Sequence, residues 1–239
     1  MSILPSREGD RQLRPRRESR KAAMRSTRDS VASPRRAKRG FGEKRHIDSV
    51  TCLDMAIVIS MLRGVNLGKY KRLKMEALRE LYESLGLRDV QSYLQSGNIV
   101  FRSKSTSTAA LEKLLEGEAK KRLGLETTFF IRSTAEWHAL IAGNPFPREA
   151  KSDPARLVAL VLKESPHAAA VKALVAAVRG KESVRVNGNV AYIVYPDGQG
   201  TSKLTNTVIE SKLGTRGTAR NWNTVLKLAA LAAPGKEEA

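Results

Sequence analysis

The chain has 239 residues, of which 41% are hydrophobic, and its formal net charge is +19. This length allows one large domain or two small ones with a buried core, so the fold needs no disulfide or metal for stability. Cys52 is the single cysteine, which excludes a disulfide framework and a cysteine zinc cluster and indicates a reducing compartment. No apolar run approaches the roughly 20 residues that span a bilayer, and the N-terminus lacks a secretory signal core. We therefore predict a cytoplasmic protein with no membrane partner.

Residues 1–54 differ in composition from the rest of the chain. They are rich in Arg, Ser and Pro, with basic clusters at 14–17 and 34–39 and almost no apolar periodicity. Such a segment buries too little apolar surface to offset the entropy of ordering, so we predict a disordered tail. One interpretation is a basic arm that holds polyanions through non-specific charge attraction. The interpretation we favour is that the tail is not native, because Met55 stands immediately before the first predicted strand, as an initiator would.

Residues 55–147 predict the element order β-α-β-β-α-β. Strand-like runs occur at 56–62, 90–95, 99–102 and 127–132, and residues 96–98 (SGN) form a compact turn between the second and third runs. A first helix has apolar residues at helical spacing from Met75 and ends at Gly86. A second helix carries leucines between 111 and 123, and a connecting helix is predicted at about 135–141.

Residues 155–239 repeat the same order. Strands are predicted at 156–163, 183–186, 190–195 and 218–220, with helices at 167–178 and 204–213. The order β-α-β-β-α-β is that of the ferredoxin-like split βαβ unit. We therefore predict an α+β fold of two tandem ferredoxin-like domains with antiparallel sheets, at 55–147 and 155–239. A C-terminal helix at 222–231 has few polar residues and is predicted to dock against the body.

Four motifs together carry a resemblance to a known family. They are residues 62–66 (LRGVN), 93–98 (YLQSGN), 195–206 (YPDGQGTSKLTN) and 217–224 (GTARNWNT). In this order and spacing, from about Met55 to Ala232, the chain resembles the bacterial domain-of-unknown-function family 1697. The resemblance implies a duplicated ferredoxin-like fold, in agreement with the element order. It implies no reaction, because the family has none assigned, and the N-terminal extension lies outside the family pattern.

Residues 196–203 form a glycine-rich loop before a predicted helix. Free backbone N–H groups at a helix start favour bound anions, glycines allow close approach, and Lys203 would add positive charge. The spacing differs from that of the nucleotide-binding P-loop, since no Gly precedes Lys203 and Leu204 stands in place of the magnesium-binding hydroxyl. The alternative is a capped turn, in which Ser202 is the N-cap and the glycines only shape the backbone.

The loop at residues 63–66 also lies between a predicted strand and a helix. Lys69, Lys71, Arg72 and Lys74 follow it closely, so a ligand phosphate would find several cations there. The alternative is that Asn66 shapes the loop while the lysines face water. Residues 95–98 have a similar alternative, in which they only close their hairpin.

Residues 220–224 combine an arginine, an aromatic residue and two amides at a helix start. One interpretation has a base stacked on Trp222 and Arg220 bound to a phosphate. In the other interpretation Trp222 is buried, Asn221 or Asn223 caps the helix, and Arg220 holds the preceding helix end or a carboxylate. We favour the second.

These motifs predict a binding protein for a phosphorylated or polyanionic ligand, with nucleic acid as one such ligand. The alternatives are an enzyme on a small phosphorylated metabolite, acting by positioning and oxyanion stabilisation, and a structural or interaction scaffold. Catalytic residues and oligomeric state are not predicted, and three histidines with one cysteine favour no metal and no cofactor. The candidate ligand-binding residues are Arg63, Gly64, Asn66, Gln95, Ser96, Asn98, Gly198, Gly200, Ser202, Lys203, Asn206, Arg220, Asn221, Trp222 and Asn223.

Overall fold

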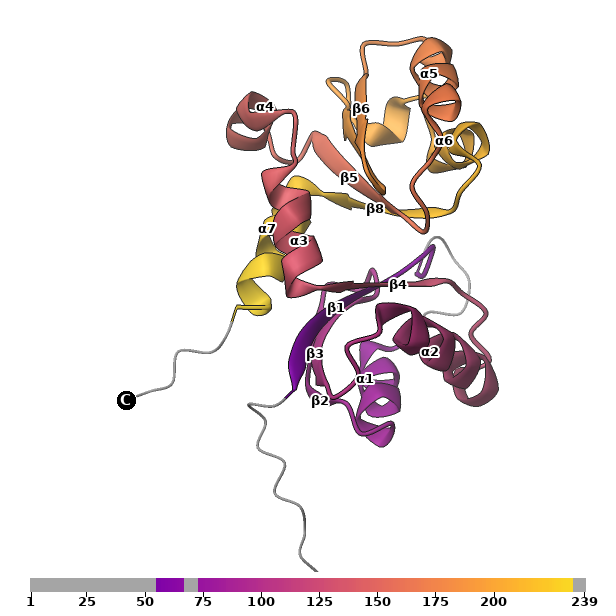
Figure 1. Cartoon of the computed structure of the whole chain (residues 1–239), viewed down its shortest axis with the longest axis vertical. Coiled ribbons are helices and arrows are strands. Elements are labelled where there is room, and N and C mark those ends of the chain that lie inside the picture. Colours follow the sequence, from indigo (N-terminus) through magenta and orange to yellow (C-terminus); the bar gives the residue numbers. More distant parts are fainter. Residues whose placement is uncertain (1–54, 67–72, 234–239) are drawn as a thin grey trace, which may run out of the picture. The chain divides into compact units, whose positions relative to one another are not determined.

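The computed structural model describes residues 55–66 and 73–233, which belong to one compact unit. They form an α+β fold with two four-stranded antiparallel sheets (Figure 1). The first sheet has the order β2-β3-β1-β4 and the second β6-β7-β5-β8. The strands are β1 (Ala56–Leu62), β2 (Arg88–Tyr93), β3 (Asn98–Ser103), β4 (Phe129–Ser133), β5 (Leu157–Leu162), β6 (Ser183–Asn187), β7 (Val190–Val194) and β8 (Gly217–Asn221). The predicted tail at 1–54 and the cations Lys69, Lys71 and Arg72 lie outside the described residues.

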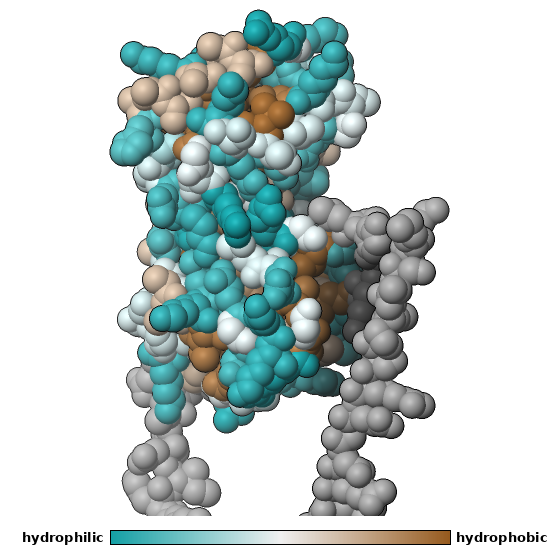
Figure 2. Space-filling model, turned by 90° about the vertical axis from the view of Figure 1, so that its right-hand side faces the viewer, coloured by the Kyte–Doolittle hydropathy of each residue, from teal (hydrophilic) through white to brown (hydrophobic). Residues whose placement is uncertain are grey.

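Two helices pack on the outer face of each sheet, and two more lie on the inner side. The helices are α1 (Met75–Ser84), α2 (Thr108–Leu123), α3 (Thr134–Ala142), α4 (Pro147–Ser152), α5 (Ala168–Ala177), α6 (Asn206–Leu213) and α7 (Trp222–Leu231). Helices α1 and α2 share a core with the first sheet, whereas α5 and α6 share one with the second. The face that carries the outer helices α2, α5 and α6 is mostly hydrophilic (Figure 2). The predicted α+β class with antiparallel sheets is thus confirmed, whereas helix α4 was not predicted.

Alternating residues of the central strands face different cores. In β1, Val58 and Leu62 pack with α1 and α2, while Ile59 and Met61 point to the opposite face, as the period of two in a strand requires. That opposite face meets the corresponding face of β5 and the helices α3 and α7 in a third cluster, which we call the central core. Its members are Ile59, Met61, Val100, Phe130, Trp137, Leu140, Leu157, Ala159, Val161, Val190, Tyr192, Val194, Trp222, Val225, Leu228 and Ala232.

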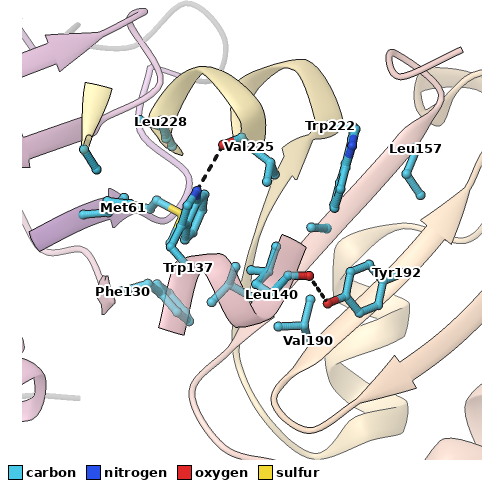
Figure 3. Close-up of a cluster of buried hydrophobic side chains, with 14 of the residues drawn as sticks. Met61, Phe130, Trp137, Leu140, Leu157, Val190, Tyr192, Trp222, Val225 and Leu228 are labelled. Atoms are coloured by element: carbon cyan, nitrogen blue, oxygen red, sulfur yellow. Dashed lines mark hydrogen bonds between the residues drawn. The ribbon is translucent and has the colours of Figure 1, made fainter. Parts of the chain in front are cut away.

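Two hydrogen bonds fix polar atoms inside the central core (Figure 3). The indole Nε1 of Trp137 in α3 donates to the carbonyl of Val225 in α7 at 3.0 Å. The hydroxyl of Tyr192 donates to the carbonyl of Leu140 at 2.7 Å, and burial raises the pKa of Tyr192 to about 12. Both bonds run between the halves, because α3 belongs to residues 55–147 and its two partners to residues 155–239. The halves therefore share one core.

The register shows that the two halves repeat position by position. Ile57 of β1 corresponds to Leu157 of β5, and their strand partners, Arg102 of β3 and Val194 of β7, correspond to each other. Arg132 lies opposite Ile59, as Arg220 lies opposite Ala159. Helix N-caps repeat as well, and their side chains all accept the expected backbone hydrogen bond: Ser107 and Thr205 begin α2 and α6, and Ser133 and Asn221 begin α3 and α7. These equivalences allow side chains of the two halves to be compared directly.

Candidate functional site

Arg220 in β8 lies at the junction of the halves and is 8% exposed. A guanidinium has five N–H donors, and each has an acceptor here. Nε donates to Asn98 Oδ1, Nη1 to Thr218 Oγ1 at 2.9 Å and the Ala219 carbonyl at 2.7 Å, and Nη2 to the carbonyls of Leu62 at 3.0 Å and Ser96 at 3.1 Å. Three of the four motifs thus meet around Arg220. No donor of this side chain is left for a phosphate.

All five acceptors of Arg220 are uncharged, and this affects its electrostatics. Burial lowers the pKa of Arg220 to about 10, because a charged group loses hydration energy inside the protein. The group still carries its charge at neutral pH. Hydrogen bonds to neutral oxygens replace its hydration, so the network is a structural one that ties β8 to the loops of the first half.

Arg132 in β4 is the counterpart of Arg220 in the other half. Its Nη2 donates to the carbonyl of Leu162, the last residue of β5, at 2.6 Å, just as Arg220 reaches the last residue of β1. Each half thus extends an arginine across the junction. Sequence analysis missed Arg132, although a signal existed: both arginines immediately precede a helix N-cap, Ser133 or Asn221.

A second pair of cross-junction contacts involves ion pairs. Arg63 follows β1, and its Nε and Nη2 donate to Glu210 of α6 at 2.9 and 2.7 Å. Lys163 follows β5 in the equivalent place, and its Nζ lies 2.6 Å from Glu112 of α2. Arg63 is therefore held by a carboxylate of the other half, in a bidentate geometry that favours arginine over lysine.

The Glu210 carboxylate gives the junction a pH dependence. Burial raises its pKa, but the hydrogen bond from Arg63 and that from the Gly217 N–H at 2.8 Å outweigh burial, so the net pKa lies below the ordinary value. The ionised form is thus favoured by folding. The resulting stability is present above the unfolded-state pKa and is lost as the pH falls through the folded-state value.

We expect Glu210→Gln to lower the free energy of unfolding by about 1 kcal/mol at pH 7, since Arg63 is partly exposed and the pair is screened by solvent. As the pH falls from about 4.5 through the lowered folded-state pKa, the wild type loses the same charge, so the difference in stability between the two proteins should shrink. Urea unfolding of both proteins between pH 3 and 7 measures this. A difference that stays constant across this range would contradict the ion-pair assignment.

The remaining residues of the first-half motifs shape the backbone of their loops. Gly64 and Asn66 have positive φ angles of 65° and 57°. The Asn66 side chain bonds the loop at both ends, since its Nδ2 donates to the Gln95 carbonyl at 2.6 Å and its Oδ1 accepts from the Leu73 N–H at 2.7 Å. Ser96 Oγ accepts from Asn98 Nδ2 at 2.9 Å. The Gln95 side chain is exposed.

The helix start at α7 is built as a cap over a buried tryptophan. Trp222 is 3% exposed and belongs to the central core, so neither ring face is open to a stacked base. Asn221 Oδ1 accepts from the Thr224 N–H at 2.9 Å and is the N-cap. The side chain of Asn223 is exposed.

The loop at residues 196–203 lines a separate cavity of about 560 Å³, which we call the second-half cleft. Its other wall is the connection between α5 and β6. Its charged, serine and threonine residues are Arg179, Lys181, Glu182, Asp197, Thr201, Ser202 and Lys203. Neither Arg63 nor Arg220 lines this cleft. The motif residues therefore divide between two places, the junction and the second-half cleft.

The hydrogen bonds of the cleft differ from those predicted for a helix start. Helix α6 begins at Asn206, and Thr205 is its N-cap, accepting from the Val208 N–H at 3.3 Å. The prediction of Ser202 as N-cap was wrong, because Ser202 lies before the helix and bonds elsewhere. Ser202 Oγ is hydrogen-bonded to the Glu182 carboxylate and accepts from the Leu204 N–H at 2.9 Å.

The other three motif positions of the loop, Gly198, Gly200 and Asn206, shape its backbone. Asn206 Oδ1 accepts from Gln199 Nε2 at 3.3 Å. Gly198 has a φ of 93°, and an added Cβ would lie 3.0 Å from the Arg156 guanidinium. Gly200 lies in a short 3-10 turn, Gln199–Thr201. The backbone of the loop is therefore fixed before any ligand binds.

Among the described residues, two cations of the second-half cleft have no ion-pair or side-chain hydrogen-bond partner. Lys181 Nζ lies 3.3 Å from Asp197 Oδ2, and the hydrogen bond from Ser202 holds the pKa of Glu182 below its ordinary value. Arg179 and Lys203 have neither an ion pair nor a side-chain hydrogen bond within the described ranges, and both are exposed. They are free to meet a ligand.

Within residues 55–66 and 73–233, no group of three or more His, Cys, Asp or Glu side chains is placed to hold a metal ion. In the same ranges, no helix has both the length and the apolar character needed to cross a membrane.

The fold and the junction define an α+β protein of two equivalent halves around a shared core. The chain belongs to the family described as protein of unknown function (DUF1697), whose model matches residues 55–192. Its fold is similar to that of the conserved bacterial protein SP0830 from Streptococcus pneumoniae, with 24% identity and a TM-score of 0.59 over 74% of this chain and 99% of that one. No curated protein matches the chain. The family resemblance is confirmed, and it carries no assigned activity.

Proposed function

We propose that the protein binds a small phosphorylated molecule in the second-half cleft. The observation that carries this proposal is the pair of unpartnered cations, Arg179 and Lys203, at a cavity of about 560 Å³. Pockets for small organic ligands usually measure roughly 300–1,000 Å³. A guanidinium and an ammonium are the side chains that most often bind phosphate.

The polar groups around these cations suggest further features of the ligand. The ionised carboxylate of Glu182 is hydrogen-bonded to Ser202, and Thr201 adds a second hydroxyl to the lining. A carboxylate accepts hydrogen bonds and repels phosphate. The ligand that suits this cleft therefore has hydroxyl groups at one end and an anionic group at the other, as a sugar phosphate does.

We further propose that each half is a ferredoxin-like unit and that residues 55–147 and 155–239 are two domains. The strand orders β2-β3-β1-β4 and β6-β7-β5-β8, each with two helices on its outer face, support this. Cytoplasmic location, an enzymatic reaction and a scaffold role stay predictions.

The double variant Arg179→Ala/Lys203→Ala tests the binding proposal. With inorganic pyrophosphate as the probe in isothermal titration calorimetry at low salt, we expect its Kd to rise about 100-fold, the equivalent of two charge-assisted hydrogen bonds of about 1.5 kcal/mol. The matched control is Lys172→Ala/Lys227→Ala, which removes the same charge from exposed positions outside the cleft. The control should bind as the wild type does.

Two results would overturn the proposal. One is the absence of saturable binding by the wild type, and the other is an equal loss of affinity in both double variants, which would indicate diffuse charge attraction. If short RNA or DNA gives a gel shift at low salt and pyrophosphate does not bind, the partner is nucleic acid and not a small molecule.

A further inference from the structure

The first half has a cleft at the position equivalent to the second-half cleft. It has a volume of about 510 Å³ and lies between the connection from α1 to β2 and the loop after β3. The register sets the equivalence: Arg102 and Val194 occupy corresponding strand positions, so the next residues, Ser103 and Tyr195, correspond too. Both of them line their clefts. We call this cavity the first-half cleft.

The two clefts differ in charge at equivalent positions. Where the second-half cleft has Glu182 and Asp197, the first-half cleft has Leu87 and Ser105. The basic residues that line the first-half cleft are Arg88 and Lys104, and within the described ranges neither has an ion pair or a side-chain hydrogen bond. No described residue that lines it is acidic. The charged side chains that line this cleft are therefore both basic, which favours an anion.

The lining of the first-half cleft also includes an exposed apolar side chain. The loop from Ser103 to the N-cap Ser107 is shorter than its equivalent from Tyr195 to Thr205. It lacks the 3-10 turn that carries hydroxyl groups into the second-half cleft. Leu114 of α2 lines the first-half cleft and is 43% exposed, and Leu85, which also lines it, is partly exposed. Covering an exposed leucine with an apolar group of the ligand removes apolar surface from water, which favours binding.

We propose that the first-half cleft is a second binding site, and that it takes an anion with an apolar body, such as an aromatic or acyl phosphate, sulfonate or carboxylate. Arg88 and Lys104 bind the anionic group, while Leu114 contacts the apolar part. This site goes beyond the proposed function, since it lies in the other half and differs in lining. The duplication thus supplies two clefts that have diverged in the chemistry of their ligands.

The fluorescent probe anilinonaphthalene sulfonate tests this proposal, because it is an amphiphilic anion whose emission rises in apolar surroundings. We expect saturable binding to the full chain, with a Kd that rises about 100-fold in Arg88→Ser/Lys104→Ser, as expected for loss of two charge-assisted contacts. Leu114→Ser should also weaken binding, but leave pyrophosphate affinity unchanged. Arg179→Ala/Lys203→Ala should bind the probe as the wild type does.

The substituted side chains are exposed and, within the described residues, make no ion pair or side-chain hydrogen bond, so the thermal midpoint of each variant should stay close to that of the wild type. The proposal is overturned if Arg88→Ser/Lys104→Ser keeps the wild-type Kd, or if the probe does not saturate. Loss of probe binding in Arg179→Ala/Lys203→Ala alone would also overturn it and move the apolar anion to the second-half cleft. Loss of pyrophosphate binding alone affects only the proposed function.

Discussion

Replacing Arg220 by methionine is expected to lower the free energy of unfolding by about 4 kcal/mol. Methionine fills much of the same space but cannot donate a hydrogen bond. The Asn98 Oδ1 atom and the Ser96 carbonyl would then lose the donor that Arg220 supplies, and the Leu62 carbonyl would keep only the hydrogen bond from Thr218 Oγ1 at 3.2 Å. Each buried acceptor left unpaired costs about 1–3 kcal/mol. Because Arg220 belongs to the second half and all three acceptors belong to the first, the substitution weakens the contact between the halves.

Urea unfolding at pH 7, followed by tryptophan fluorescence and circular dichroism, measures this effect. The matched control is Arg216→Met, which makes the same substitution at an exposed position of the same half whose one described side-chain bond is to Thr128 at 3.3 Å. The control should cost less than about 1 kcal/mol. If Arg220→Met also costs less than this, the Arg220 network is not a main structural contact.

Trp137→Ala is the second substitution with a large expected effect, again about 4 kcal/mol. Trp137 is fully buried, so its removal leaves a cavity in the central core where α3 packs against α7 (Figure 3). It also leaves the carbonyl of Val225 without its donor. Because both halves contribute to this core, the loss should affect the stability of both.

Two further variants separate the contributions to this effect. Trp137→Phe keeps an aromatic ring but loses the indole N–H, so it should cost about 1–2 kcal/mol. Leu226→Ala on α7 removes a side chain that is 44% exposed and should cost less than about 1 kcal/mol. An alanine variant of Trp137 that is as stable as the Leu226 variant would show that the central core does not hold the halves together.

Most of the elements could be predicted because local patterns specify them. The first strand and the last helix were predicted with the bounds that β1 and α7 have, since a continuous apolar run and a single-face apolar pattern define them. Helix α6 begins two residues later than predicted, because Thr205 and not an earlier hydroxyl caps it. Helix α4, which has only six residues and no buried one, has no apolar periodicity to indicate it and was not predicted.

The division of the candidate site could not be predicted, because partners from distant parts of the chain decide it. Arg63 and Arg220 have the composition of ligand-binding residues, but Glu210 and Asn98, which hold them, lie in the opposite half. Nothing in the local sequence pairs these residues. Arg179 was missed for the opposite reason: it looks like any solvent-facing basic residue until the loop at 196–203 is placed beside it.

The account therefore gives the motif residues two roles. Arg63, Asn98 and Arg220 join the two halves, with Arg132 and Lys163 as counterparts in the repeat. The loop that carries Gly198, Ser202 and Lys203 supplies one wall of a cleft with free cations. A ligand for this protein should be sought at the clefts, and loss of function in Arg220 variants should follow from loss of stability.

Titration of isotopically labelled protein with inorganic pyrophosphate, followed by amide chemical shifts in NMR, tests the location of binding most directly. The account predicts saturable shifts at residues 179–182 and 198–203, with residues 63–66 and 96–98 unchanged. Shifts confined to residues 63–66, 96–98 and 217–221 would instead place the ligand at the junction and contradict the structural role of Arg63 and Arg220.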